Sequence, residues 1–321
     1  MLRLLGWSAF AFATPALLAQ PAPRKAEVLW QKLEAEVARE VQAVNGVMGV
    51  VIVDLRTGRR LAIHGDEVFP TASTIKLAVL AELYRQSQEA GAIPATASGT
   101  AAIAPGRARL TDRYTLRAED LVEDSFILGG LTPGVTQLTN RDLATCMVAV
   151  SDNAATNLLI DRVGAGAVNA LLEGLGLKQT RLRRKMMDLK AAQEGRENTG
   201  TPAEFAALLE ALHQGRVLNP AMTADFFSVL GTGKDSPLPR LLPEGVRVAN
   251  KPGSLGGVRA DVGLIFLPER PFIVCAMGAF LGDERSAEQT ISRIARSAYR
   301  HFEALAVSSP LGRAMGPRTL N

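Results

Sequence analysis

The chain has 321 residues, of which 47% are hydrophobic and 21% are charged, so it is long enough to bury a sizeable core in one or two domains. This composition excludes a wholly disordered, collagen-like or coiled-coil protein. A net charge of only +4 and an aromatic content of 5% argue against a nucleic acid as the partner.

The first residues have the pattern of an export signal. Arg3 gives a positive start, residues 4–18 are mainly apolar, and a candidate cleavage point follows Ala19. The apolar run is shorter than the roughly 20 residues of a membrane-spanning helix. We therefore expect residues 1–19 to be a cleaved signal peptide, with no stable membrane insertion; an uncleaved anchor is the alternative. The mature chain, residues 20–321, would then act in the periplasm or outside the cell.

The hydrophobic pattern changes between strand and helix periods along the chain. Strands are predicted over residues 46–55, 59–64, 246–254, 260–267 and 271–280. Helices are predicted over residues 24–44 and 284–305, and further helices begin at Thr71, Thr139, Thr201 and Asn219. Residues 91–108 are rich in Ala, Gly, Pro and Thr, so an irregular loop is expected there.

Strands thus lie at both ends of the chain, and helices lie in its middle. The simplest arrangement is an α/β (α+β) fold in which both chain ends form one antiparallel sheet flanked by helices. Residues 24–70 and 245–305 would form this α/β lobe, and residues 71–244 would form an inserted all-helical lobe. The groove between the two lobes is the expected site.

Ser73 and Lys76 lie three positions apart in a mostly apolar helical segment. At this spacing their side chains share one helix face. A lysine whose pKa is lowered by burial can accept the proton of a serine hydroxyl. Chance also gives such a pair about once in a chain of this length, so alone it is equally consistent with an exposed serine and lysine.

Two further polar motifs follow along the chain. Ser151, Asp152 and Asn153 lie between two predicted helices, where all three are also common capping residues. Lys251 and Gly253 lie in a predicted strand, where the alternative is a strand end followed by turn residues. No G-x-S-x-G motif occurs, so the signature of a Ser-His-Asp esterase is missing.

In this order, Ser-x-x-Lys, Ser-Asp-Asn and Lys-x-Gly are typical of the penicillin-recognising serine enzymes. The sequence resembles class A β-lactamases over nearly all of residues 28–305. Residues 57–70 resemble the first hairpin of that family, residues 151–159 resemble the helix of its second motif, and residues 180–182 lie where its omega loop begins. The resemblance implies the fold shared by serine β-lactamases and transpeptidases.

The resemblance also implies a role for each catalytic group. Ser73 would be the acylated nucleophile, Lys76 would help to deprotonate it, and Ser151 would relay a proton to the leaving nitrogen. The backbone N–H groups of Ser73 and Ser254 would form the oxyanion hole, where one donor typically contributes about 10²–10³ in rate.

The same resemblance implies the substrate contacts. Asn153 would bind the amide side chain of the substrate, and Lys251 would hold positive potential beside its carboxylate. Gly253 and Ser254 would line the site on the strand. Arg259 would pair with the carboxylate, because a guanidinium suits such a group, although a surface arginine at a strand start is the alternative.

Pro252 is the first departure from the family, which usually has threonine in its Lys-Thr-Gly motif. The threonine hydroxyl is lost here, and Ser254 could replace it. Proline also lacks an N–H group, so its presence predicts that this strand lies at the edge of the sheet.

The omega loop is the second departure. Met186 occupies, without gaps, the position of the glutamate that activates water in hydrolysing relatives. Asp188 is the nearest carboxylate that could take this role, and Glu194 and Glu197 are further candidates. The alternative is that all three acids are solvated loop residues. We therefore expect acylation with slow deacylation.

The leading hypothesis is a β-lactamase-type hydrolase, with a D-alanyl-D-alanine peptidase acting on peptidoglycan peptides or a penicillin-binding sensor without turnover as alternatives. No metal is expected, because the histidines, at positions 64, 213 and 301, are scattered. No cofactor is expected, and the protein is expected to be a monomer. Cys146 and Cys275 are expected to be buried free thiols, with a mutual bridge as the alternative.

Overall fold

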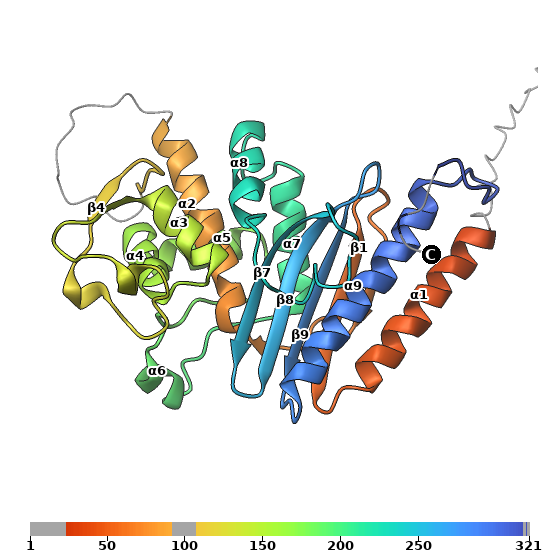
Figure 1. The fold of residues 1–321 in the computed structure, drawn as a ribbon, viewed down its shortest axis with the longest axis horizontal. Coiled ribbons are helices and arrows are strands. Elements are labelled where there is room, and N and C mark those ends of the chain that lie inside the picture. Colours follow the sequence, from red (N-terminus) through yellow and green to blue (C-terminus); the bar gives the residue numbers. More distant parts are fainter. Residues whose placement is uncertain (1–23, 92–106, 317–318, 320–321) are drawn as a thin grey trace, which may run out of the picture.

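The computed structural model describes residues 24–91, 107–316 and 319 of the chain (Figure 1). Five antiparallel strands form one sheet in the order β2-β1-β9-β8-β7. These strands are β1 (Val47–Asp54), β2 (Arg60–Ile63), β7 (Arg247–Leu255), β8 (Val258–Phe266) and β9 (Phe272–Ala279). The expected signal peptide and most of the expected loop at 91–108 lie outside the described residues.

The sheet joins the two ends of the chain at its centre. β1 pairs with β9 along its whole length, from Val47 opposite Ala279 to Asp54 opposite Phe272. Apart from Val47, every residue of these two strands is buried. The predicted antiparallel sheet formed from both chain ends is therefore confirmed, and β7 lies at its edge, as Pro252 required.

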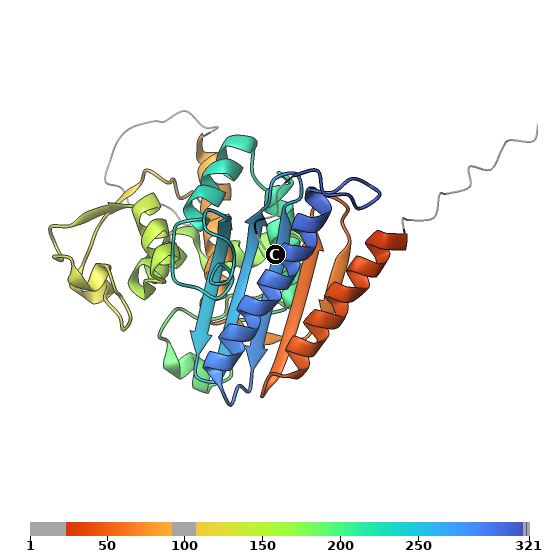
Figure 2. The same ribbon diagram turned by 45° about the vertical axis from the view of Figure 1, so that its right-hand side comes forward.

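Helices cover both faces of the sheet (Figures 1 and 2). α1 (Arg24–Gln42) and α9 (Glu284–Ala306) pack side by side on one face, where Trp30 and Phe302 are buried. α7 (Pro202–His213) contacts β1, β8 and β9 on the other face. The sheet is therefore the middle layer of three, as expected for an α/β fold.

The predicted inserted segment, residues 71–244, is not one separate lobe, because its helix α7 belongs to the sheet layers; the remainder packs against the edge strand β7. Its helices are α2 (Lys76–Gly91), α3 (Asn140–Ala149), α4 (Asn153–Val163), α5 (Ala165–Gly174), α6 (Leu189–Gln193) and α8 (Pro220–Leu230). It is not all-helical, because β4 (Arg113–Thr115) pairs with β5 (Gln137–Thr139), and β6 (Thr199–Gly200) pairs with β3 (Phe69–Pro70). Ladders of two or three residues are too short to show an alternating pattern in the sequence.

The predicted helix starts at Thr139, Thr201 and Asn219 are confirmed by their caps. The start predicted at Thr71 is wrong by several residues, because a 3-10 turn without a side-chain cap follows Thr71 and the α-helix begins at Lys76. The Thr139 side chain accepts a hydrogen bond from the Asp142 N–H group, and the Asp142 carboxylate accepts one from the Thr139 N–H group. Thr201 caps α7 at the N–H group of Glu204, and Asn219 caps α8. Each cap satisfies a donor that the helix itself leaves free, so these starts could be recognised locally.

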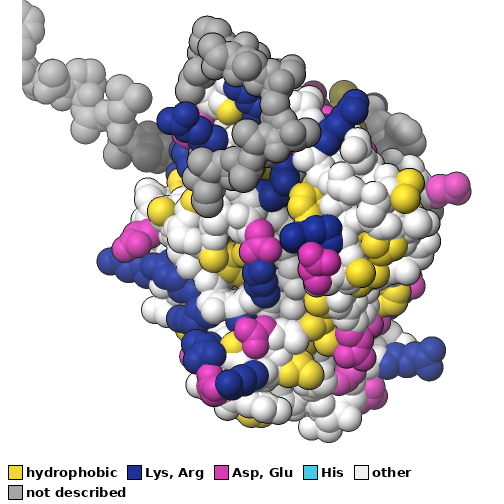
Figure 3. Space-filling model, turned by 90° about the vertical axis from the view of Figure 1, so that its left-hand side faces the viewer, with side chains coloured by type: hydrophobic (Ala, Val, Ile, Leu, Met, Phe, Trp, Pro, Cys, Tyr) yellow, Lys and Arg dark blue, Asp and Glu magenta, His cyan; other side chains and the backbone are white. Residues whose placement is uncertain are grey.

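Charged side chains of both signs are mixed over the face formed by the inserted segment (Figure 3). No helix among the described residues is long and apolar enough to cross a membrane. Cys146 and Cys275 are both free thiols. Cys275 is fully buried as expected, whereas Cys146 is only partly buried.

Candidate active site

A cavity of about 370 Å³ opens between the end of β7, the start of α2, the junction of α3 with α4, and residues 184–189. Ser73, Ser151, Asn153 and Ser254 all line it. Residues from three distant parts of the sequence therefore meet in one place, between the sheet edge and the inserted helices.

Ser73 lies in a short 3-10 turn, η1 (Ala72–Ile75), which leads directly into α2. The preceding residue, Ala72, has a φ of 47°, in the left-handed region that costs a non-glycine residue about 1–3 kcal/mol. Ser73 is partly exposed in the cavity, whereas Thr74 and Ile75 after it are buried. The strained turn thus presents a serine hydroxyl at the cavity surface.

Gly253 lets the edge strand approach this turn closely. A Cβ atom on Gly253 would lie 2.9 Å from the carbonyl oxygen of Thr71 and 3.0 Å from the main-chain nitrogen of Ser73. Any side chain would therefore push β7 away from the serine. The sequence analysis places Gly253 in the strand that lines the site. The close approach of its main chain to Ser73 explains why glycine is needed at this position.

Lys76 is fully buried at the start of α2, and its Nζ atom has three hydrogen-bond acceptors. These are the Ser151 carbonyl at 2.6 Å, the Ser151 hydroxyl at 3.0 Å and Asn153 Oδ1 at 2.8 Å. Burial, and next the positive charge of Lys251, hold the pKa of Lys76 well below its usual value. As an ammonium, Lys76 donates to all three acceptors; as a neutral amine it keeps two donors, and its lone pair can accept a proton.

Ser151 connects two lysines. Its hydroxyl accepts hydrogen bonds from Lys76 Nζ at 3.0 Å and from Lys251 Nζ at 3.1 Å. Its φ of 60° is a second left-handed backbone position in the site. Asp152 caps α4 at the Ala155 N–H group. Asp152 therefore serves as a helix cap, the alternative interpretation of this motif. The Ser151 hydroxyl instead contacts the amines of Lys76 and Lys251.

Lys251 is almost fully buried on β7, beside a second lysine that sequence reasoning missed. Burial, and next the positive charge of Lys234, lower the pKa of Lys251 to about 7, against the opposing effect of Asp261. Burial also lowers the pKa of Lys234 to about 8, and its Nζ atom donates to the Leu230 carbonyl at 2.9 Å. Lys234 follows α8 and has no local motif that could have marked it.

Asp261 is the buried carboxylate near these lysines. It accepts hydrogen bonds from Asn250 Nδ2 at 2.8 Å and from the Leu238 N–H group at 3.0 Å. Burial raises its pKa to about 6, against the effects of these donors and of both lysines. Asp261 thus links β8, β7 and the segment that carries Lys234, and it is a second site residue that the motifs did not reveal.

An apolar side chain stands where the sequence resemblance places the omega-loop glutamate. Met186 lines the cavity and is 8% exposed. Asp188 does not line it; its Oδ1 atom accepts from the Ala191 N–H group at 3.0 Å and caps α6. Glu197 is paired with Arg184 at 2.8 Å. Among the residues described as lining the cavity, the carboxylate is that of Asp124, which sequence reasoning did not consider.

Arg259 lies on β8 with its guanidinium turned to α9. Nε donates to Glu288 at 2.9 Å, and a terminal nitrogen is paired with Glu284. The other terminal nitrogen donates to the Leu255 and Val258 carbonyls. Arg259 lies opposite Ser254 in the β7–β8 register but does not line the cavity. Its two carboxylate partners compete with any substrate carboxylate.

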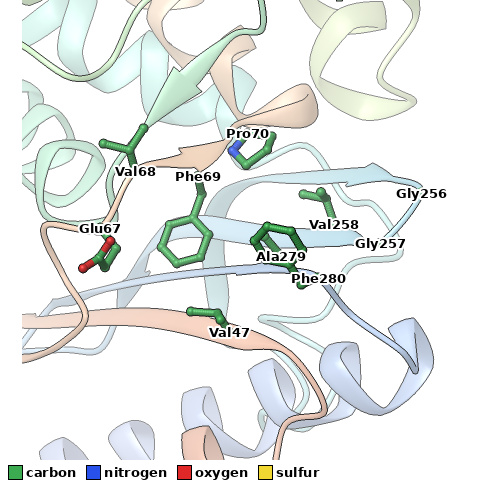
Figure 4. Close-up of a pocket in the computed structure, with 10 residues that line it drawn as sticks. All are labelled: Val47, Glu67, Val68, Phe69, Pro70, Gly256, Gly257, Val258, Ala279 and Phe280. Carbon is green, nitrogen blue, oxygen red and sulfur yellow. The ribbon is translucent and has the colours of Figure 1, made fainter. Parts of the chain in front are cut away.

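A neighbouring cavity of about 580 Å³ lies beyond the β7–β8 turn (Figure 4). Phe69 and Phe280 line it together with Gly256 and Gly257. Apart from Glu67, its lining side chains are apolar, and Ser73, Lys76 and Ser151 are not among them. The described part of the chain also holds no cluster of three or more His, Cys, Asp or Glu residues that could bind a metal.

Comparison with known proteins agrees with this geometry. Residues 32–302 match the model of the beta-lactamase enzyme family. The chain is 31% identical over 231 residues to beta-lactamase L2 of Stenotrophomonas maltophilia, covering 70% of each protein. It is similar to the structure of a beta-lactamase from Sphaerobacter thermophilus, with a TM-score of 0.73, 34% identity and coverage of 84% and 97%. A leucine-to-glutamate mutant of PBP-A, solved as an acyl-enzyme complex with penicillin G, has a TM-score of 0.71, 28% identity and coverage of 86% and 97%.

Proposed function

The chain belongs to the beta-lactamase enzyme family as a β-lactamase-like serine hydrolase, and we propose that it opens β-lactam rings through an acyl intermediate on Ser73. One observation carries this proposal. The Ser151 hydroxyl contacts the amines of Lys76 and Lys251 in the cavity that Ser73 also lines. Nucleophile, base, relay and cation are thus assembled without a histidine.

Acylation begins with the neutral amine of Lys76. It accepts the hydroxyl proton of Ser73 while Ser73 Oγ bonds to the lactam carbonyl carbon. The carbon–nitrogen bond of the ring then breaks, and the ring nitrogen takes a proton from the Ser151 hydroxyl. Ser151 regains a proton from Lys76, 3.0 Å away, so that the proton removed from Ser73 ends on the product nitrogen.

The substrate carboxylate is assigned to Lys251, with Lys234 as the second cation. The positive charge of Lys251 lowers the pKa of Lys76, and the positive charge of Lys234 lowers the pKa of Lys251. The three amines are therefore close enough to act on one another. A buried ammonium is a strong attractant for an anion, since little water screens it. Arg259 contributes less here, because Glu284 and Glu288 already neutralise it.

Deacylation is proposed to be slow. Water must attack the Ser73 ester, and a positioned base usually accelerates such a step by about 10²–10⁴. Met186 cannot accept a proton, and the Asp188 carboxylate is engaged in capping α6. The acyl-enzyme should therefore accumulate, which leaves a penicillin-binding protein with little turnover as the second candidate. The similarity to PBP-A supports that candidate.

Intact-protein mass spectrometry after mixing with a penicillin tests both candidates. We expect the protein to gain the mass of one penicillin rapidly and to lose it slowly. In a separate assay, nitrocefin should be turned over at a low steady rate. A permanent adduct would favour the binding protein, and release of D-alanine from a peptidoglycan peptide would favour a peptidase. The absence of any adduct and of turnover would refute the acyl-serine mechanism.

Export is proposed from the N-terminal sequence. Arg3 and the apolar residues 4–18 support a signal peptide cleaved near Ala19. Protein isolated from the producing cells should begin close to Gln20 on N-terminal sequencing. A mature chain that begins at Met1 would contradict cleavage.

A further inference from the structure

A large cavity lies at one end of the helical layer formed by α1 and α9, apart from the catalytic cavity. Its volume is about 1040 Å³, and it lies between the start of α1, the end of α9 and residues 308–312. Figures 1 and 2 show α1 and α9 on the face of the sheet away from α7. Small-molecule pockets typically have about 300–1,000 Å³, so this cavity has room for a ligand.

The walls of this cavity are largely apolar. The apolar lining side chains include Val28, Leu29, Ala304, Leu305 and Leu311. Val28 is 49% exposed and Leu311 is 79% exposed. Exposed apolar groups gathered around a hollow are typical of a binding site rather than of ordinary protein surface.

The charged lining residues are all basic. They are Lys25, Arg56 and Arg270, and no acidic residue lines the cavity in the described part of the chain. Lys25 Nζ donates to the Leu311 carbonyl at 3.0 Å. The side chains of Lys25 and Arg56 form no ion pair with any described residue, and residues 1–23, 92–106, 317–318 and 320–321 contain no Asp or Glu. These two cations therefore have no acidic side chain of this protein as a partner.

Two buried polar atoms beside the cavity are also without a partner among the described residues. One is Nε of Arg270, whose terminal nitrogen binds Asp54 at 2.6 Å. The other is Nε2 of His301, whose ring packs against Trp30 at 5.6 Å and Phe302 at 5.0 Å and does not line the cavity. Both atoms are buried below the cavity surface, so the lining residues alone indicate the nature of the ligand.

We propose that this cavity binds a small anionic amphiphile, a single aliphatic chain that ends in a carboxylate. The chain packs against Val28, Leu29 and Leu305. The carboxylate lies at Lys25 and Arg56, where charge-assisted hydrogen bonds replace the missing ion pairs. This binding is independent of acylation at Ser73.

Decanoate is the probe that tests the proposal, by isothermal titration calorimetry and thermal unfolding on the chain that begins at residue 20. We expect decanoate below its micelle concentration to bind with one site and to raise the melting temperature, because a ligand of the folded state stabilises it. 1-Decanol, which lacks the charge, and acetate, which lacks the chain, should each bind at least tenfold more weakly. Equal binding of decanol and decanoate would overturn the proposal.

Matched variants locate the site. The double variant Lys25→Gln, Arg56→Gln should lose at least tenfold in decanoate affinity, because both cations that hold the carboxylate are removed. The variant should still fold, because neither side chain forms an ion pair with a described residue. Lys178→Gln removes an exposed lysine outside this cavity and should keep full affinity. Unchanged affinity in the double variant would overturn the proposal.

A second, uncharged change separates the cavity from surface charge. Ala304→Phe fills the space beside Leu305 and should weaken decanoate binding while penicillin acylation stays unchanged. Phosphatidylglycerol vesicles distinguish a membrane surface from a soluble anion. Vesicle binding without decanoate binding would assign the cations to a membrane contact and overturn the cavity proposal.

Discussion

The Asn157 side chain binds both main-chain polar groups of Met186. Nδ2 of Asn157 donates to the Met186 carbonyl at 3.1 Å, and Oδ1 accepts from the Met186 N–H group at 2.8 Å. α4 thereby fixes the main chain of residue 186 beside the cavity, independently of the side chain at this position. This support means that a carboxylate could be introduced there without rebuilding the loop.

Met186→Glu should accelerate deacylation. A glutamate on this fixed backbone would reach the cavity and could activate water, which typically contributes about 10²–10⁴ in rate. Pulse-chase mass spectrometry of the penicillin adduct measures its lifetime. We expect the adduct to disappear at least 100-fold faster than in the unchanged protein, an estimate from the lower end of that range.

Met186→Gln is the matched control, because glutamine has nearly the same shape as glutamate but no basic carboxylate. Its adduct should persist as long as that of the unchanged protein. Equal acceleration by both variants would attribute the effect to polarity or loop loosening and would contradict the role of a missing base.

Asp188→Asn should have little effect on the adduct lifetime. Asn can still accept the hydrogen bond from the Ala191 N–H group, so the cap of α6 is retained. Asp124→Asn tests the carboxylate that does line the cavity. If residual deacylation uses a protein acid, the adduct should persist longer in Asp124→Asn only; a longer lifetime in Asp188→Asn would restore the sequence-based assignment.

Ser73→Ala should abolish covalent labelling by a fluorescent penicillin, because it removes the only oxygen proposed to form the ester. Ser286→Ala, at the start of α9, is the control and should label fully. Circular dichroism checks that both variants are folded. Labelling of Ser73→Ala at the normal level would require another nucleophile.

Much of the fold could be predicted because its signals are local. Neighbours in sequence form the Thr139 and Thr201 caps and the alternation of the short apolar strands. The strands near both ends of the chain could therefore be predicted. β4 and β5 were missed, because three residues per strand carry too little alternation. Their pairing depends on a contact between segments that are about twenty residues apart.

The candidate site divides in the same way. Ser73 with Lys76, and Ser151 with Asn153, stand close in sequence, so their spacing marked them. Lys234 and Arg259 depend on distant partners: Lys234 on the buried environment of Lys251, and Arg259 on two acids of α9. No spacing rule gives such contacts, and the strand position of Arg259 alone could not tell whether its charge was already paired.

The pH dependence of kcat/KM should have two limbs with different causes. Burial holds the pKa of Lys76 below its usual value, so acid pH protonates the base and lowers kcat/KM. Lys251 has a pKa lowered to about 7, so rising pH through this value removes the charge that attracts the substrate carboxylate. With nitrocefin, kcat/KM should therefore fall on both sides of a maximum, the alkaline fall beginning near pH 7.

A methyl ester of the same substrate has no carboxylate, so its alkaline fall should vanish while the acid fall remains. Lys251→Arg keeps the charge at all these pH values and should shift the alkaline fall of nitrocefin upward as well. If ester and acid show the same alkaline fall, Lys251 does not bind the carboxylate, and a different group must be titrating there.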